Sequence, residues 1–439
     1  MKKVAIFLVV LSLCVCVFYA YTQLSAQSVI IIDNETGEAC EIKINLNIKN
    51  NDQEPIEEKP EVKVDEKTEQ DIEEELREID SGDEVIVKKV YTDFDILNYI
   101  SNEKNYMLSP FSLKVAMMMA ANGAESKTQK EILEAFGIED IQEYNQKIED
   151  VMTRYNNTEE VKLNVANSIW LNKDIALKIL FNDEYKDIIE KYYKGDAKEV
   201  ASEEAVSSIN AWVEEKTEGK INNLITDPNF LSVLINTVYF KGTWAEQFDD
   251  YLTEKDIFTD VKGTEVEKEF MNKTGRFNYF QDDTMQMLKL PYLGSKTSMY
   301  VVIPKTEGDL DFNNAISNMT SKKINVTIPK FKVEYSIVLN DILNQMGIDV
   351  AFTENADFGK MFNSESKDIF YISQVLQKTF IEVDENGTEA AAATAIILKN
   401  SAFMPQPEEI VDFIANKPFI YFIRDDETGE ILFLGKILY

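Results

Sequence analysis

The chain has 439 residues, with 45 Lys and Arg against 78 Asp and Glu, a formal net charge of −33 and no histidine. The missing histidine excludes Ser-His-Asp and Cys-His nucleophilic catalysis and HExxH zinc sites. The acidic balance argues against a nucleic-acid partner, because phosphate binding needs a basic surface. All three cysteines, Cys14, Cys16 and Cys40, lie near the start, so we expect no disulfide or cysteine-based metal site beyond them.

Residues 1–26 resemble a secretory signal. Two lysines are followed by an apolar run over 4–20 and by small residues at Ser25 and Ala26. The run is also near the length of an uncleaved membrane anchor, so a membrane tether through 4–20 stays open as the alternative. Either interpretation predicts that the bulk of the chain is exported, as a secreted protein or as one anchored at the outer face of the cell membrane.

Residues 27–90 form an N-terminal extension. Alternating apolar and polar residues over 28–50 predict a small hairpin. Residues 51–85 contain 16 acidic and four basic residues and no aromatic residue. Such a stretch buries too little apolar surface to offset the entropy of ordering it, so we interpret it as a disordered acidic spacer. Only 69–79 within it has a helical period.

From about Val90 the sequence predicts a globular domain. Helical spacing and capping residues predict helices over 94–100, 109–123, 126–136 and 205–219. Apolar, β-branched and aromatic runs predict strands over 165–172, 233–242, 285–292, 297–305, 323–335, 378–385, 419–425 and 431–437. Helices that cluster early and strands that cluster late predict an α+β fold with large antiparallel sheets.

The segment 381–398 does not fit a simple surface element. It begins as a strand, turns at Asn386-Gly387 and is uncharged from Ala390 to Leu398. Its alanine run favours a short helix, whereas an extended strand of such small residues fits between two existing strands. At period two, one face of that strand would carry Thr388, Ala390, Ala392, Thr394, Ile396 and Leu398. The 31 positions from Gly387 to Pro418 are long for a loop, which is typical of a functional segment.

This hinge resembles that of the serpin family. Its residues are Glu385, Asn386, Gly387, Thr388, Glu389, Ala390, Ala391, Ala392, Ala393 and Thr394, close to the pattern of inhibitory members. Further stretches resemble the family in the same order, at 109–112, 167–170, 235–244, 328–331, 416–419 and 433–436. Each stretch alone is weak evidence, but the ordered series is specific and covers about residues 91–439.

The resemblance implies a serpin fold with three mainly antiparallel or mixed sheets, about eight or nine helices and an exposed reactive loop over 387–413. It implies a suicide inhibitor of serine proteases, with cysteine proteases as further targets, and not an enzyme. The target attacks the loop and forms an acyl-enzyme, and the loop then inserts into the main sheet of a metastable fold. A covalent complex with the protease, a monomer, and no cofactor or metal are implied as well.

The resemblance also assigns roles at the hinge. Thr388 would be the first residue to enter the sheet, and Gly387 would allow a positive φ there. Glu385 and Lys330 would form an ion pair at the top of the main sheet, with Trp244 packed beneath them.

A polar cluster of Ser109, Asn236 and Gln377 would lie where the strands part to admit the loop. Many family members have a histidine where Gln377 stands. Glutamine bridges strands through its amide but does not titrate. We therefore expect sheet opening to lack the pH sensitivity that a histidine would give.

The family's spacing from the hinge glutamate places the reactive bond between Ser401 and Ala402, which favours an elastase-like or subtilisin-like target. Lys399, Asn400, Phe403 and Met404 are the alternatives nearby. The loop after this bond is a few residues longer than in several family members, so its register stays open.

Two other functions are weighed against inhibition. The first is a non-inhibitory serpin that serves as a binding or carrier module, but such members tend to have charged or bulky hinge residues, which this hinge lacks. The second is a carboxylate-based hydrolase, which the acidic composition permits but no residue spacing supports.

Overall fold

The computed structural model divides the chain into two compact units, Met1–Tyr91 and Thr92–Tyr439. The residues that it describes are 27–32, 39–44, 84–89, 92–156, 161–176, 179–306, 308, 310–363, 370–388 and 409–439. The predicted signal or anchor, almost all of the acidic spacer and most of the predicted reactive loop lie outside the described residues. No helix among the described residues is long and apolar enough to cross a membrane.

The described part of the first unit is a three-stranded antiparallel sheet. Its strands are β1 (Gln27–Ile32), β2 (Ala39–Ile44) and β3 (Glu84–Lys89), in the order β2-β1-β3. The predicted hairpin is confirmed as β1 and β2, and Cys40 lies in β2. The predicted spacer, residues 51–85, overlaps β3 by two residues, because residues 84 and 85 already pair with β1.

The predicted helices 109–123 and 126–136 start within one residue of the observed ones, whereas the predicted helix 205–219 lies three residues earlier, at 202–216. Ser109 caps α3 (Pro110–Gly123) by accepting a hydrogen bond from the Ser112 N–H, and Pro110 takes the first position, where its missing N–H costs nothing. The predicted segment 94–100 is the 3-10 helix η1 (Asp93–Tyr99). The remaining α-helices are α4 (Ser126–Ala135), α5 (Ile141–Asn156), α6 (Asp183–Tyr193), α7 (Ser202–Lys216), α8 (Phe312–Ser317) and α9 (Asn340–Gln345).

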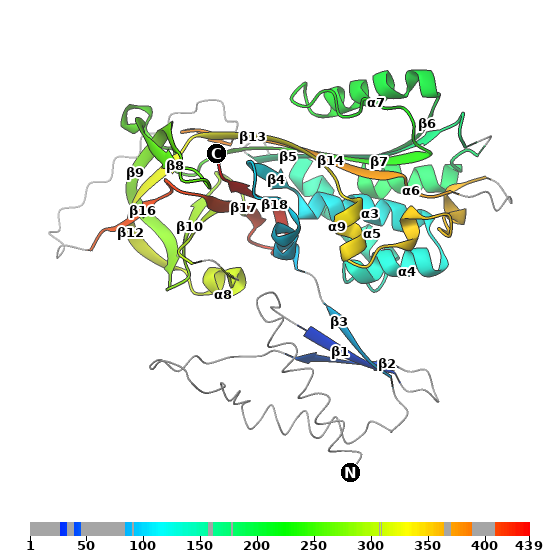
Figure 1. Cartoon of the computed structure of the whole chain (residues 1–439), viewed down its shortest axis with the longest axis horizontal. Coiled ribbons are helices and arrows are strands. Elements are labelled where there is room, and N and C mark those ends of the chain that lie inside the picture. Colours follow the sequence, from blue (N-terminus) through cyan, green and yellow to red (C-terminus); the bar gives the residue numbers. More distant parts are fainter. Residues whose placement is uncertain are drawn as a thin grey trace, which may run out of the picture. The chain divides into compact units, whose positions relative to one another are not determined.

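A six-stranded sheet forms one layer of this unit. Its order is β13-β14-β15-β7-β5-β6. The strands are β5 (Val161–Asn172), β6 (Asp196–Val200), β7 (Ser232–Thr243), β13 (Phe331–Val338), β14 (Gln374–Val383) and β15 (Gly387–Thr388). Figure 1 shows α7 on one face of this sheet and α3, α5 and α6 on the other. A small core that includes Trp212 fills the α7 face, and the main core fills the other.

A nine-stranded sheet makes the second layer, with the order β16-β12-β9-β10-β11-β17-β18-β4 and with β8 paired to β9. Its strands are β4 (Tyr106–Leu108), β8 (Glu254–Thr259), β9 (Glu265–Gln281), β10 (Met285–Pro291), β11 (Thr297–Pro304), β12 (Thr320–Pro329), β16 (Val411–Ile414), β17 (Phe419–Asp425) and β18 (Ile431–Ile437). The predicted α+β class is confirmed.

One predicted strand is in fact two. The run 323–335 splits between β12 of the nine-stranded sheet and β13 of the six-stranded sheet. The Lys330 N–H still donates to the Glu269 carbonyl of β9, and from Phe331 onward the chain pairs with β14 instead. Lys330 therefore lies where the chain passes from one sheet to the other, close to the start of β13 and the end of β14.

Candidate functional site

The hinge residue Thr388 already lies inside the six-stranded sheet. In strand β15 it pairs with Val383 of β14 on one side and with Gly242 of β7 on the other, antiparallel to both. Its side chain is fully buried. Farther along, β7 and β14 pair directly and in parallel, from Val233 opposite Gln374 to Tyr239 opposite Phe380. The two strands thus form a fork, and Thr388 sits between its arms.

A tight turn over residues 384–387 brings Thr388 into the fork. The Asp384 carboxylate accepts hydrogen bonds from the N–H groups of Asn386 (2.8 Å) and Gly387 (3.2 Å). Gly387 has φ +151°, and a Cβ at this position would lie 2.1 Å from the carbonyl oxygen of Gly242. Only glycine fits such a backbone approach, so Gly387 is required both for its conformation and for its lack of a side chain.

Two stacked aromatic rings hold the ends of the turn. The Trp244 indole lies 4.6 Å from the Tyr292 ring, nearly parallel to it, and its N–H donates to the carbonyl oxygen of Asp384 (3.0 Å). The Tyr292 hydroxyl is 2.7 Å from the hydroxyl oxygen of Thr388. Burial raises the pKa of Tyr292 well above its ordinary value, although the Thr388 hydrogen bond opposes this. The phenol is therefore neutral, and one of the two hydroxyls donates this hydrogen bond to the other.

Glu385 and Lys330 form the ion pair expected at this end of the sheet. Their side-chain atoms are 3.1 Å apart, and Glu385 also accepts a hydrogen bond from the Thr253 hydroxyl (2.6 Å). Burial disfavours the charged form of Glu385, but the hydrogen bonds from Thr253 and Lys330 outweigh it, so the pKa of Glu385 is lowered. Burial likewise works against the charge of Lys330, yet its contacts with Glu385 raise the pKa of the lysine. Trp244 directly follows β7 and is buried, and both its backbone N–H and its indole N–H donate to carbonyls of the turn that carries Glu385.

The structure also brings Ser109, Asn236 and Gln377 together. Gln377 accepts from the Ser109 N–H (2.8 Å) and donates to the Ser109 carbonyl (3.0 Å) and to the Asn236 side-chain oxygen (2.6 Å). Asn236 in turn donates to Ser112 and to Asn167. These five side chains are all buried and link β5, β7 and β14 to the start of α3.

Sequence reasoning missed several partners of the hinge. Tyr292 and Thr253 contact the hinge and belong to no local motif. Ser112 and Asn167 contact Asn236 of the polar cluster and lie in the family-like stretches 109–112 and 167–170, but the sequence assigned them no role. The stretch 235–244 and residue Tyr292 are each apolar and typical of a strand, and nothing in a single sequence indicates that the tyrosine hydroxyl meets Thr388. Asp384 was within the predicted strand 378–385, but its role in the turn depends on Gly387 and Gly242 packing together.

The predicted loop limits, 387 and 413, are too wide. Gly387 and Thr388 belong to β15, and Val411–Ile414 form β16, which pairs in parallel with β12. Phe413 is fully buried, with its ring edge-on to Tyr279. The remaining predicted positions lie outside the described residues: Glu389, Ala390, Ala391, Ala392, Ala393, Thr394, Ser401 and Ala402.

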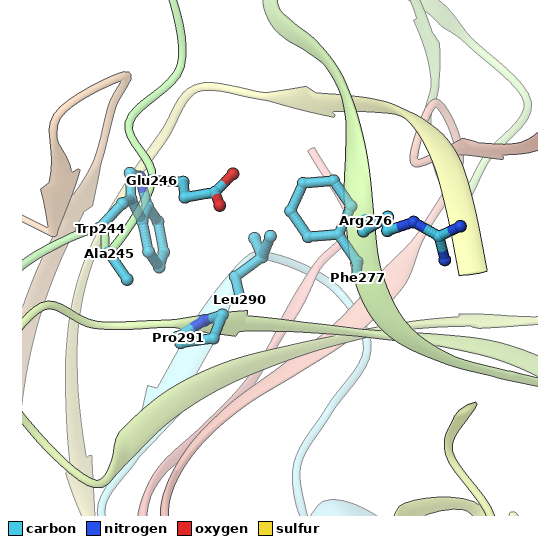
Figure 2. A pocket seen from close by; sticks show the side chains of 7 residues that line it. All are labelled: Trp244, Ala245, Glu246, Arg276, Phe277, Leu290 and Pro291. Atoms are coloured by element: carbon cyan, nitrogen blue, oxygen red, sulfur yellow. The ribbon is translucent and has the colours of Figure 1, made fainter. Parts of the chain in front are cut away.

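A pocket of about 120 Å³ lies between the residues that follow β7 and the strands β9 and β10. Figure 2 shows Trp244, Phe277 and Leu290 around it, with the Glu246 carboxylate directed toward it and the Arg276 guanidinium directed away. Within the described residues, no group of three His, Cys, Asp or Glu is placed to hold a metal ion.

Comparison with known proteins shows the family. Residues 92–439 match the family model of serpins, described as serine protease inhibitors. An uncharacterised serpin-like protein of Thermococcus kodakarensis is 36% identical over 373 residues, which cover 79% of this chain and 83% of the relative.

Solved structures agree with that match. The native state of the thermophilic serpin tengpin superposes with a TM-score of 0.70 at 32% identity, covering 78% of this chain and 91% of tengpin. Human thyroxine-binding globulin, solved in complex with thyroxine, superposes with a TM-score of 0.69 at 25% identity, covering 78% of this chain and 94% of the globulin. The chain belongs to the serpin family.

Proposed function

We propose that this chain is an exported suicide inhibitor of serine proteases, and not an enzyme. The observation that carries the proposal is the position of Thr388, buried between β7 and β14 at the open end of the fork. The first residues of the loop thus already pair with both strands, at the place where the rest of the loop would insert after cleavage. The apolar run after the two N-terminal lysines supports export.

The pairing of Thr388 sets the register for the rest of the loop. Continued in the same register, residue 394 would come between Asn236 and Gln377, which are opposite each other in the closed sheet. Thr388 points into the main core, so every second residue after it would do the same. Thr394 would then meet the polar cluster, and its hydroxyl supplies both a donor and an acceptor there.

Insertion also increases the number of backbone hydrogen bonds. The closed part of the fork has one ladder, of seven residue pairs between β7 and β14. An inserted loop replaces it with two ladders, one on each side of the new strand, at about 1 kcal/mol per additional hydrogen bond. The uncleaved protein is therefore metastable, and its lifetime is set by the barrier to opening the fork.

The reactive bond is assigned to Ser401 and Ala402, with a covalent complex to a serine protease as the product. Small residues at this bond favour elastase-like or subtilisin-like proteases. Lys399 would instead favour a trypsin-like target, and Phe403 a chymotrypsin-like one.

The test is to mix the full chain with elastase, subtilisin, trypsin and chymotrypsin and to separate the products on a denaturing gel. A covalent complex of chain and protease is expected with at least one of them, and mass spectrometry of the released C-terminal fragment identifies the bond. If every protease cleaves the loop and none is trapped, the inhibitor proposal fails.

A further inference from the structure

The two ends of the reactive loop lead to the same outer region of the nine-stranded sheet. Before the loop, Glu385 is bonded to Thr253, which directly follows the 3-10 helix η2 (Asp250–Leu252). After the loop, Ile410 leads into β16 at the edge of the sheet. Figure 1 shows β8, β9, β12 and β16 together at one end of this unit.

A continuous row of side chains joins these two places. Ile414 of β16 is opposite Thr327 of β12, and Thr327 is opposite Asn272 of β9, so all three lie on one face. The Thr327 hydroxyl donates to the Asn272 side-chain oxygen (2.7 Å), and the Asn272 amide donates to the carbonyl of Leu252 (2.9 Å). With strands about 4.8 Å apart, the row spans roughly 15 Å from Ile414 to Leu252.

Large apolar side chains are exposed at both ends of this row, and Ile410 is exposed four residues before Ile414, just ahead of β16. Tyr251 is 95% exposed, Leu252 50%, Ile410 48% and Ile414 44%. These four, here called the loop-end strip, are among ten large hydrophobic side chains that are exposed within the described residues. Apolar groups gathered at one site on a surface mark an interaction site more often than scattered ones do. A fully exposed tyrosine is the kind of side chain that anchors protein interfaces.

We infer that the loop-end strip is a secondary docking surface for the target protease. The inference rests on the proposed function, because it is the loop that brings the protease to this face. A standard interface buries about 800 Å² on each partner, which is more than the scissile segment alone provides. A protease bound to the loop therefore also contacts the surface between the two ends of the loop, where the loop-end strip lies. The strip is bordered by exposed acidic side chains, Asp249, Asp250, Glu409 and Asp412, which outnumber the basic side chains Lys323 and Arg276 on the same face. The matching protease surface is apolar with a rim of Lys and Arg.

The experiment uses the full chain and the protease that forms the fastest covalent complex among elastase, subtilisin, trypsin and chymotrypsin. The test variant combines Tyr251→Ser with Ile414→Thr, since both side chains are exposed and neither is buried in the core. The matched control is Val338→Thr, which changes a 48%-exposed apolar residue at the opposite end of the six-stranded sheet. The measured quantities are the second-order rate of complex formation, the stoichiometry of inhibition and the thermal midpoint.

The strip variant should lower the association rate about tenfold, consistent with the loss of one aromatic anchor. The stoichiometry and the thermal midpoint should stay unchanged, because loop insertion does not involve these side chains. The rate of the unmodified chain should also fall as salt is added, since its acidic rim steers a basic partner. An unchanged rate with a normal covalent complex overturns this inference alone, whereas the absence of any complex in the unmodified chain overturns the proposed function itself.

Discussion

The open hinge end and the closed middle part of the fork between β7 and β14 are held by different groups. At the hinge end the strands are separated by Thr388, and the groups that fix them come from elsewhere in the fold: Tyr292, Thr253 and Lys330. In the middle the strands pair directly, and Gln377 and Asn236 join them to α3. A strand can therefore pair at the hinge end without a change in the sheet. Farther along, β7 and β14 must separate and the Gln377 hydrogen bonds must break before a strand can insert.

The largest effect is expected from Thr388→Arg. Thr388 has no exposed surface, and a buried arginine without a partner is strongly unfavourable. The hinge should be expelled from the fork, so that a protease cleaves the loop and escapes. On a denaturing gel the covalent complex should be replaced almost completely by cleaved chain.

Thr388→Ser is the matched control for that variant. It keeps the hydroxyl that meets Tyr292 and should trap protease at close to the unmodified ratio. Normal trapping by Thr388→Arg would show that the hinge end of the fork has no part in insertion.

The next largest effect should come from Gln377→Leu, in the closed part of the fork. The change leaves the Ser109 N–H and the Asn236 side-chain oxygen without their partners in a buried site. Each orphaned group costs about 1–3 kcal/mol. The thermal midpoint should fall by several degrees, and inhibitory activity should be lost faster on incubation, because the fork opens more easily.

Gln377→His tests the same site through pH. The unmodified chain should show no steep change in its rate of activity loss between about pH 6 and 7, because Gln377 does not titrate. The histidine variant should show one, since histidine changes charge in that range. A steep change in the unmodified chain would assign the pH dependence to another group.

The same contrast separates what the sequence predicts from what it does not. Of the two strands of the fork, β7 follows closely from its apolar run, whereas the predicted strand 378–385 omits residues 374–377 of β14 and extends into the turn. The family resemblance places Glu385 with Lys330 and Gln377 with Ser109. The structure brings both sets together. The split of 323–335 at Lys330 was not predicted, because β-propensity does not say which of two sheets a strand joins. Tyr292 and Thr253 were missed because their contacts with the hinge span 96 and 132 residues.

Tyr292→Phe should have a smaller effect, confined to the hinge end. It keeps the ring that stacks on Trp244 and removes only the hydroxyl that meets Thr388. Such a hydrogen bond is worth about 1 kcal/mol, or about fivefold in the equilibrium between an inserted and an expelled hinge. The ratio of inhibited to cleaved product should fall accordingly.

A double-mutant cycle with Thr388→Val measures that contact directly. If the two hydroxyls act through each other, the double variant should behave like either single one, with a coupling near 1 kcal/mol. Additive effects would mean that the two residues act independently.

The smallest effect should be the pH dependence of the ion pair at the hinge. The pKa of Glu385 is lowered from its ordinary value of 4.5. A carboxylate with a lowered pKa in the folded state stabilises the fold above its unfolded pKa, and this stabilisation is lost as the pH falls through the folded value. Thermal midpoints of the unmodified chain and of Glu385→Gln should therefore differ near neutral pH and converge as the pH falls below 4.5 and through the lowered folded-state pKa.

The difference near neutral pH should be at most about 1 kcal/mol, because the Lys330 side chain is 35% exposed and water screens part of the attraction. Glu382→Gln is the matched control. Glu382 pairs with Lys332 on the same sheet, but both side chains are well exposed, so its substitution should have a smaller effect at every pH. A Glu385→Gln difference that stays constant down to pH 3 would mean that Thr253, which does not titrate, supplies the stabilisation and that the charge of Glu385 is not what holds the hinge end of the fork.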